Sequence, residues 1–398
     1  MKVYIICQGG FPLGMAPNKR KLCLAKALLQ AGIDCRVLVF ARHDNRLQQE
    51  KDNADSGSFE GVPFTFIGKD VNDSKGIISK IRAICSCFEL IHYLKRNLSS
   101  GDIVYSYVPD KFTLSFMDII ISVVHHKKAK YVRELCELPF GKGKETKKTV
   151  ANRKRILEKQ FNKYDGILSI SQSLSELAKQ YTRPDCKIFQ LPILVEYEKY
   201  ALEDKPELAE VPYIFHSGSL TEQKDGILGM IEAFGMATKQ LGFPIRFIFT
   251  GNKEKSLFSK EIDGLVEKYE LTDKLIFTGF ISDDILKNYL QRATLVIINK
   301  YPNQQNNYCF STKLGEYMAA GKPVIITNVG DAKIWLTNRK DALIVETQNT
   351  EVMAKAIVEL FTDSELRTRL SNNAKITCQH AFDYRVYSSP LKDFFSKL

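Results

Sequence analysis

The sequence predicts an α/β protein built from two doubly wound parallel sheets in tandem. Three observations point to this fold class. The chain has 398 residues, which is more than one hydrophobic core usually serves. Short β-branched or aromatic runs alternate with amphipathic helical stretches, as in parallel sheets covered by helices on both faces. This alternation stops once, at residues 192–212, and then starts again.

In the first half, strands are expected at residues 2–7, 35–40, 63–67, 103–107, 130–134 and 166–170. A helix over 19–30 fits between the first two strands and is ended by Gly32. The stretch 192–212 holds three prolines among Glu, Lys and Tyr residues, which is typical of a linker.

In the second half, strands are expected at 213–216, 246–250, 274–278, 294–298, 323–327 and 342–345. The last residues, 384–398, have the pattern of a separate amphipathic helix that can cross back to the first domain. The expected division is a first domain over 1–191, a linker over 192–211, a second domain over 212–380 and a terminal helix over 381–398. Ligands of such sheets bind beyond the carboxyl ends of the strands.

The composition is that of an ordinary globular protein, with 44% hydrophobic and 26% charged residues. The apolar run 3–7 is too short for a signal-peptide core, and the run 112–124 is broken by Asp118. Nine cysteines without paired spacing indicate reduced thiols in a cytoplasm. We expect no structural metal and no cofactor.

Positive charge is concentrated in the first half of the chain. Residues 1–200 hold 33 Lys and Arg against 21 Asp and Glu, whereas residues 201–398 hold 24 against 25. Within 127–159 there are twelve basic residues and four glutamates, which predicts an anionic partner, with a solvated basic face as the alternative. Apolar residues Ile156, Leu157 and Phe161 follow the basic run and favour an anionic membrane surface over nucleic acid. We therefore expect peripheral attachment to the inner face of the plasma membrane.

The loop after the first expected strand, residues 8–14, contains Gly10 and leads into a helix. Glycine lets a ligand approach the backbone, and a helix start supplies partly positive N–H groups. The spacing is not that of a dinucleotide-binding loop, and Arg42-His43 stand where an acidic residue would bind the ribose of NAD. A tight turn without a ligand is the alternative.

The equivalent loop of the second half places Gly218 and Ser219 before Lys224. The ammonium group of Lys224 can offset the charge of a leaving diphosphate, although a surface lysine at a helix start is the alternative. Gly251, directly after the strand expected at 246–250, is included in the same binding set.

The stretch 308–326 carries the strongest signal. Ser311 is expected to cap a helix that starts near Thr312, and Gly321 to end it. The helix dipole and the N–H groups at 311–313 suit a phosphate, and Glu316, one turn in, can reach ribose hydroxyls. The alternative for Glu316 is a carboxylate that only complements the dipole.

These stretches together resemble the retaining, family 4 glycosyltransferases with the GT-B fold, in which two Rossmann-like domains face a cleft. The motifs are, in order, Gly218-Ser219-Leu220 with Lys224-Asp225-Gly226, Ile231-Glu232-Ala233-Phe234, Phe277-Thr278-Gly279-Phe280, Thr312-Lys313-Leu314-Gly315-Glu316-Tyr317 and Ala320-Gly321-Lys322-Pro323-Val324-Ile325.

The resemblance implies a first domain on the acceptor side and a second domain that binds the donor nucleotide. It implies that Lys224 contacts the donor diphosphate and Glu316 its ribose. The backbone at Ser311 and Thr312 would cradle phosphate, and Phe280 would border the nucleobase.

Two departures from the family pattern concern the donor. Tyr308 stands where the family commonly has a glutamate that faces the transferred sugar, and the arginine often found near Ser219 is missing. We expect sugar recognition to shift to the amide-rich loop 303–307, with Asn307 and Tyr308 as candidates. More of the diphosphate charge would then rest on Lys224.

In the first half, the segment 133–139 is similar to the family's acidic segment near the acceptor. Glu137 is the preferred candidate to orient or deprotonate a hydroxyl, with Glu134 as runner-up and ion pairing to lysines as the alternative. His216, at a strand end, is a further candidate.

The sequence therefore predicts a metal-independent, retaining glycosyltransferase that uses a nucleoside-diphosphate sugar, UDP-linked, and extends a surface or capsular glycan or a lipid-linked acceptor. A nucleotide-sugar epimerase of the same architecture would differ in needing no acceptor. A non-catalytic nucleotide-sugar-binding protein is the other alternative, if Tyr308 marks a lost activity.

Overall fold

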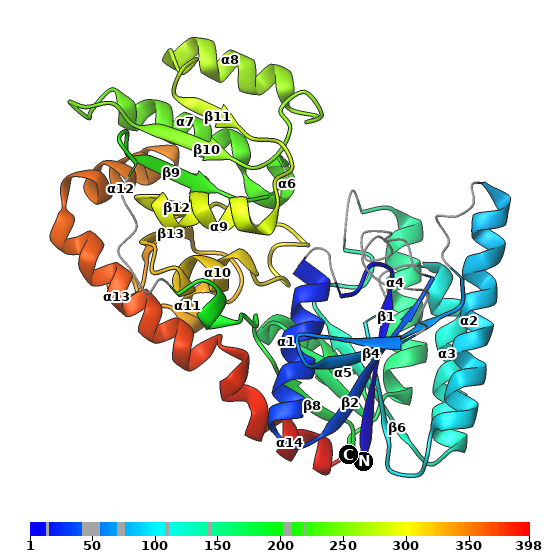
Figure 1. Ribbon diagram of the computed structural model, residues 1–398. Helices are drawn as coiled ribbons and strands as arrows, with labels where there is room; N and C mark the ends of the chain where they lie inside the picture. The colour runs from blue at the N-terminus through cyan, green and yellow to red at the C-terminus, as the bar shows by residue number, and fades with distance from the viewer. Residues whose placement is uncertain are drawn as a thin grey trace. The chain divides into compact units, whose positions relative to one another are not determined.

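The computed structural model describes residues 1–12, 16–41, 56–69, 76–107, 111–141, 145–201, 209–218 and 220–398. The chain divides into two compact units, each with a parallel sheet flanked by helices (Figure 1). The first unit comprises Met1–Leu194 together with Tyr384–Leu398, and the second comprises Val195–Asp383.

The sheet of the first unit has the strand order β3-β4-β2-β1-β5-β6-β7-β8, and all neighbours are parallel except β3 and β4. The strands are β1 (Lys2–Gln8), β2 (Asp34–Phe40), β3 (Ser56–Phe59), β4 (Val62–Ile67), β5 (Ile103–Ser106), β6 (Lys130–Leu135), β7 (Gly166–Ser169) and β8 (Lys187–Gln190). The helices are α1 (Ala16–Gln30), α2 (Ile77–Asn97), α3 (Lys111–His126), α4 (Lys147–Gln160), α5 (Gln172–Tyr181) and α14 (Ser388–Ser396), with 3-10 turns at Phe161–Lys163 and Tyr384–Tyr387.

The sheet of the second unit is parallel throughout, with the order β11-β10-β9-β12-β13-β14. The strands are β9 (Tyr213–His216), β10 (Arg246–Phe249), β11 (Leu275–Phe277), β12 (Leu295–Ile298), β13 (Val324–Thr327) and β14 (Leu343–Val345). The helices are α6 (Glu222–Asp225), α7 (Ile227–Thr238), α8 (Ser259–Tyr269), α9 (Asp283–Arg292), α10 (Lys313–Ala319), α11 (Ala332–Trp335), α12 (Thr350–Thr362) and α13 (Ser364–Ala381), and a 3-10 turn covers Tyr197–Lys199.

The predicted fold class is confirmed, and each of the twelve expected strands is present with its ends within one residue. The expectation omitted β3 and β8, because both are short and lie at the sheet edges, where few side chains are buried and the apolar pattern is weak.

The terminal helix belongs to the first unit, as predicted. α14 packs on α1, and its Leu391 and Phe394 are part of the first core. Gly166 of β7 makes room for this packing, since a Cβ there would lie 2.9 Å from the Phe394 ring and 2.8 Å from Leu398. Residues 384–398 therefore complete a core that the first 194 residues leave open.

One expectation about the basic segment is wrong. Ile156 and Leu157 of α4, and Phe161 directly after it, are buried in the first unit and do not form an apolar face for a membrane. The apolar side of α4 packs against the core of the first unit, and the basic side of the helix faces outward. Among the described residues, no helix combines the length and the apolar character needed to cross a bilayer.

We expect Phe394→Ala to destabilise the first unit by about 3 to 5 kcal/mol, because it removes a buried ring from the contact with Gly166. Hydrogen exchange of the backbone amides of β1, β6 and β7 would report the loss. The control is Lys392→Ala at an exposed position of the same helix, which should change stability by less than about 0.5 kcal/mol. Equal protection in both variants would contradict this role of α14.

Candidate functional site

The loops beyond the carboxyl ends of the second sheet form the candidate site. Because its strands are parallel, these ends lie at one edge of the sheet. The loop after β9 leads into α6, and β12, its neighbour in the sheet, is followed by Asn299 and Lys300. Asn299 donates from Nδ2 to the backbone oxygen of Gly226 at 2.8 Å, which fastens the end of α6 to β12.

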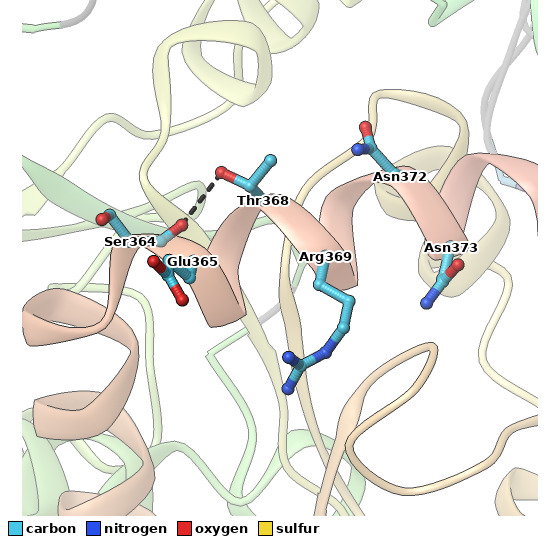
Figure 2. Close-up of a pocket in the computed structure, with 6 residues that line it drawn as sticks. All are labelled: Ser364, Glu365, Thr368, Arg369, Asn372 and Asn373. Carbon is cyan, nitrogen blue, oxygen red and sulfur yellow. Dashed lines mark hydrogen bonds between the residues drawn. The ribbon is translucent and has the colours of Figure 1, made fainter.

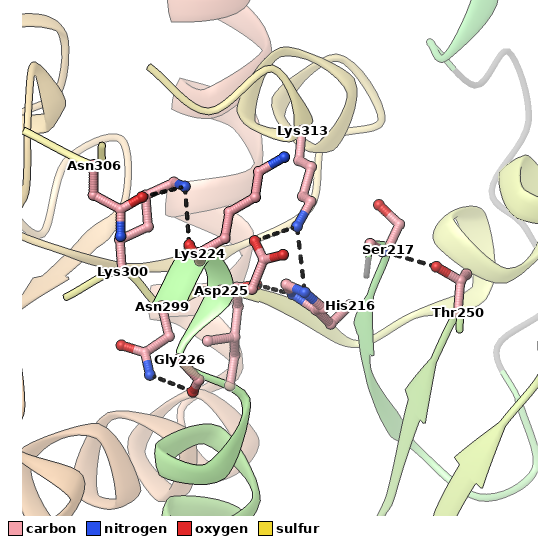
Figure 3. Close-up of polar contacts among 12 residues, drawn as sticks. His216, Ser217, Lys224, Asp225, Gly226, Thr250, Asn299, Lys300, Asn306 and Lys313 are labelled. Carbon is pink, nitrogen blue, oxygen red and sulfur yellow. Dashed lines mark hydrogen bonds and ion pairs between the residues drawn. The ribbon is translucent and has the colours of Figure 1, made fainter. Parts of the chain in front are cut away.

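Three lysines gather around one carboxylate at this edge (Figure 3). Lys313, the first residue of α10, donates from Nζ to Oδ1 of Asp225 at 2.7 Å and lies 3.4 Å from Nε2 of His216. Lys300 donates from Nζ to the backbone oxygen of Lys224 at 3.2 Å. The Lys224 side chain is exposed. We call Lys224, Lys300, Lys313 and Asp225 the lysine cluster.

Burial governs the ionisation of the cluster. It lowers the pKa of Lys300 to about 8, although Asp225 opposes the shift. It also lowers the pKa of Lys313, again against the influence of Asp225. Burial by itself would raise the pKa of Asp225, but the positive charge of Lys313 and its neighbours lowers it to about 2. At neutral pH the cluster therefore carries more positive than negative charge, which suits a polyanion.

His216 is a neutral part of this arrangement. Burial, followed by the charge of Lys313, lowers its pKa to about 3. Its Nδ1–H donates to the backbone oxygen of Ile297 at 2.9 Å, which leaves Nε2 to accept from Lys313. The ring thus orients the Lys313 ammonium group without adding charge.

Small residues bring the backbone close to the cluster. Gly218 donates from its N–H to Oγ1 of Thr250 at 2.8 Å, and a side chain at position 218 would collide with the Lys313 ammonium group. Gly251, with φ of 128°, and Gly279 exchange two backbone hydrogen bonds of 3.0 Å, which join the loops after β10 and β11. Ser219 lies outside the described residues.

The start of α10 differs from the expectation. Ser311 does not cap the helix. The N-cap position, directly before Lys313, is taken by Thr312, whose side chain makes no capping hydrogen bond. Thr312 already has helical dihedral angles, φ −62° and ψ −27°, and the Ser311 carbonyl accepts from the N–H of Leu314 at 3.1 Å. The turn therefore closes through the backbone. The predicted end is confirmed, with Gly321 at φ 62° just beyond the helix.

Glu316 lies in the first turn of α10 and is half-buried. The hydroxyl of Tyr200 donates to its Oε1 at 2.9 Å. Tyr200 follows the 3-10 turn Tyr197–Lys199 and is 6% exposed, so it holds the carboxylate in one orientation from a buried position.

The amide-rich loop is tied to α6. Asn303 and Asn306 both donate from Nδ2 to the backbone oxygen of Gln223, at 2.7 and 3.1 Å. These two amides therefore support the segment that carries Lys224. Asn307 is exposed and Tyr308 is half-buried.

Phe280 follows Gly279 in the loop after β11. Its side chain is 85% exposed, which is unusual for so large an apolar residue. An exposed ring beside a strand-end loop offers a flat surface on which a planar ligand group can stack.

The first unit holds the remaining candidates, Gly10 after β1 and Glu137 after β6. Both follow parallel strands and so lie at one edge of that sheet. Glu137 is half-buried. Tyr107 follows β5, the strand between β1 and β6 in the sheet. Burial is the largest cause that raises the pKa of Tyr107, and the negative charge of Glu137 is the next.

Glu134 differs from Glu137 in being engaged within the core. Its Oε1 accepts from Nε of Arg20 at 2.5 Å. The Arg20 side chain is 5% exposed and the Glu134 side chain 4% exposed. Arg20 also donates to the backbone oxygens of Leu191 and Pro192. Its charge holds the pKa of Glu134 below the usual range against the effect of burial. A carboxylate bound in this way is a structural anchor, so Glu137 stays the better acceptor-side candidate.

A separate hollow lies over α13 (Figure 2). It is lined by Ser364, Glu365, Thr368, Arg369, Asn372 and Asn373. All six residues belong to one helix and none to a strand-end loop, so we do not assign the site to this hollow.

Comparisons with known proteins bear on the second unit. Residues 201–377 match the family model of the glycosyl transferases group 1. The matched segment lies within the second unit. The resemblance to glycosyltransferases with the GT-B fold is thereby confirmed.

Curated relatives match the chain in part. An alpha-D-kanosaminyltransferase of Streptomyces kanamyceticus is 24% identical over 177 residues, which are 44% of this chain and 42% of that protein. The lipopolysaccharide core biosynthesis glycosyltransferase LpsD of Rhizobium meliloti is 27% identical over 138 residues, or 35% and 38% of the two chains. The chain thus spans about two fifths of the length of these two relatives.

Solved structures match the whole chain in fold. Sucrose-phosphate synthase of Thermosynechococcus elongatus matches with a TM-score of 0.72 at 16% sequence identity. The match covers 100% of this chain and 98% of the synthase chain. HepE of Anabaena in complex with UDP and glucose has a TM-score of 0.72 at 16% identity and covers 100% of both chains.

Sequence reasoning missed three residues of the second unit's site. Lys313 was inside a recognised motif but had no role, and Lys300 is the second residue after a buried strand, a position that could have marked it. Tyr200 lies in the proline-containing stretch, and no sequence signal connects it with Glu316 across 116 positions.

We expect the ring resonances of His216 to stay constant between about pH 8 and about pH 5, because its pKa lies near 3 while an ordinary histidine titrates in this window. Histidine-selective NMR of the full chain would test this, with free histidine in the same buffers as the titrating reference. A His216 midpoint near that of free histidine would contradict the arrangement around Lys313.

Proposed function

We propose that the chain transfers a sugar from a nucleoside-diphosphate sugar, UDP-linked, to a glycan or lipid-linked acceptor, with retention of configuration and without a metal ion. The product would be part of a surface or capsular polysaccharide. The observation that carries the proposal is the lysine cluster at the strand ends of a group 1 glycosyltransferase domain.

The lysine cluster supports the diphosphate end of the donor. The Lys313 ammonium group pairs with the Asp225 carboxylate, the Lys300 ammonium group holds the backbone of Lys224, and the backbone of Gly218 comes close to the Lys313 ammonium group. Negative charge grows on the diphosphate as the sugar leaves, and fixed positive groups stabilise that charge most in a buried site. Lys224 is assigned the direct contact, because its side chain is exposed, while Lys313 and Lys300 supply charge from behind.

The nucleoside end of the donor is assigned to Glu316 and Phe280. Glu316, oriented by Tyr200, would accept hydrogen bonds from ribose hydroxyls, and the exposed Phe280 ring would stack on the base. The backbone at Ser311 and Thr312 would meet phosphate. Asn307 and Tyr308 would face the transferred sugar.

In the proposed reaction the acceptor hydroxyl attacks the anomeric carbon on the face from which the diphosphate leaves. Its proton passes to a phosphate oxygen of the donor, so no dedicated base is needed. Of the first unit's candidates, Glu137 would orient the hydroxyl and Gly10 would be a backbone contact for the donor. HepE of Anabaena, with the same fold, has been solved with UDP and glucose, which supports UDP as the nucleotide to test first.

The decisive experiment is incubation of the purified chain with UDP-sugars, with and without candidate glycan acceptors, followed by mass spectrometry. Transfer that requires an acceptor is expected. A changed nucleotide-sugar without an acceptor would indicate an epimerase instead. Thermal stabilisation by UDP-sugars without any turnover would indicate a non-catalytic binder. Absence of stabilisation by all nucleoside diphosphates would refute the donor site, since a ligand at 100 times its Kd adds about 2.7 kcal/mol.

UDP affinity should fall as pH rises through about 8, because the positive charge of Lys300 attracts the anion and the pKa of Lys300 is lowered to about 8. The positive charge is fully present below that value and is lost above it. Calorimetry should show a loss of up to about tenfold across the transition, which corresponds to about 1.4 kcal/mol of electrostatic attraction. Lys300→Gln should bind more weakly and lose this pH dependence; an unchanged profile would exclude Lys300.

Glu316→Gln should weaken UDP binding by about 1 to 3 kcal/mol with the fold intact, because an amide replaces the charged acceptor of two ribose hydroxyls. Tyr200→Phe is the matched variant: it frees the carboxylate without removing it and should cost less. Calorimetric affinity equal to the parent in Glu316→Gln would remove Glu316 from the site.

Lys224→Ala should lower kcat more than it raises KM, because its charge matters most as the diphosphate leaves. The exposed Lys239, on the far end of α7, provides the control substitution to Ala. Steady-state kinetics separate the two parameters. A change in KM alone would reduce Lys224 to a binding contact.

A further inference from the structure

The helix α2 carries an apolar stripe on the surface of the first unit. Ile77, Ile81, Ile84 and Phe88 follow one another at intervals of four, three and four residues, so they share one face of the helix. Their exposed fractions are 74%, 52%, 37% and 56%. We call these four residues the α2 stripe.

The stripe is not the side that α2 turns toward the core. The buried residues of α2 are Ser86, Cys87, Leu90, Ile91 and Leu94, all from the tenth residue of the helix onward. The first nine residues of the helix, 77–85, include none that is buried. Ile78, outside the stripe, is also 55% exposed, so the first half of α2 stands clear of the core with apolar side chains outward.

No other described helix exposes as many large apolar side chains. Exposed apolar residues are ordinary when they are single, but a continuous stripe marks an interaction surface. The stripe continues onto the neighbouring helix α3, because Phe88 meets Phe116 edge to face at 5.5 Å between ring centroids.

Basic residues accompany the stripe. α2 carries Lys80, Arg82, Lys95 and Arg96 against the single acidic residue Glu89. An apolar stripe with basic neighbours is the pattern of a helix that lies in the interface of an anionic bilayer, with apolar side chains between the lipids and basic groups at the phosphates.

We propose that the α2 stripe is the face by which this protein docks on an anionic lipid bilayer. A second copy of the chain fits the charges less well, because two α2 helices would bring their basic residues together. The anionic surface neutralises them instead. The surface excess of basic residues in the first half of the chain adds attraction at distances up to about 10 Å, the Debye length.

In this proposal α2 and α4 contribute differently to attachment to the bilayer. α4 is basic, but its Ile156 and Leu157 point into the core, so it can attract a bilayer without entering it. α2 supplies the apolar side chains that enter. The inference concerns attachment only and stands whether or not the chain transfers sugar.

The first experiment is cosedimentation of the full chain with phosphatidylcholine vesicles, with and without phosphatidylglycerol. The variant replaces Ile77, Ile81 and Phe88 by Ser, all at exposed positions, and should bind the anionic vesicles at least about tenfold more weakly than the parent. The matched control replaces three exposed apolar residues of the second unit, Leu257, Ile334 and Ile376, by Ser and should bind like the parent.

Equal binding by the α2 variant and the parent would overturn the proposal, as would binding that does not depend on phosphatidylglycerol. Light scattering would test the alternative that a second copy of the chain binds the α2 stripe. If the parent forms a dimer and the α2 variant does not, the stripe is a dimer interface. Thermal stabilisation by UDP should be the same in parent and variant, so failure of the donor site is distinguished from failure of docking.

The second experiment places a reporter in the stripe. The chain has one tryptophan, Trp335, in the second unit. Phe88→Trp adds another, whose emission should shift to shorter wavelength on anionic vesicles, while the parent shows no shift. A Phe88→Trp spectrum unchanged by vesicles that sediment with the protein would show that binding occurs elsewhere and would refute the proposal.

Discussion

The ion pair between Lys313 and Asp225 is the interaction on which the second unit's site depends. It joins the first residue of α10 to the last residue of α6, and the buried ring of His216 accepts from the same ammonium group. Burial makes each of these charges costly alone, and the pair offsets that cost. The same ammonium group fills the space beside Gly218, so the geometry of the glycine loop and the charge of the cluster are set together.

The loop from Tyr301 to Tyr308 extends this arrangement. Asn303 and Asn306 hold the backbone of α6, and Lys300 holds it from the neighbouring strand. The segment 300–306 thus fixes the position of the Lys224 backbone, while the Lys224 side chain stays exposed. A rigid base with an exposed charged end is suited to meet a ligand whose charge changes during a reaction.

In the first unit, the end of strand β6 carries a structural ion pair. Arg20 and Glu134 form a buried pair there, and Arg20 also holds the backbone at Leu191 and Pro192. This pair supports the place where the chain leaves the first unit, and α14 closes its core from the other end of the sequence. The other acidic candidate, Glu137, comes three positions later, after the strand has ended.

The sequence by itself determined twelve of the fourteen described strands, the doubly wound fold class and the order of the motifs, because periodic burial and strand-end loops leave local patterns. It also marked Lys224, Glu316 and the glycines of the strand-end loops as candidates. Tertiary structure decided which polar groups meet: Tyr200 with Glu316, and Lys300 and Lys313 with the segment that carries Lys224. It also decided that Ile156 and Leu157 face inward while Ile77 and Ile81 face outward. Both helices have apolar residues at helical spacing, and the spacing shows that a face exists but not what covers it, since that depends on partners distant in the chain.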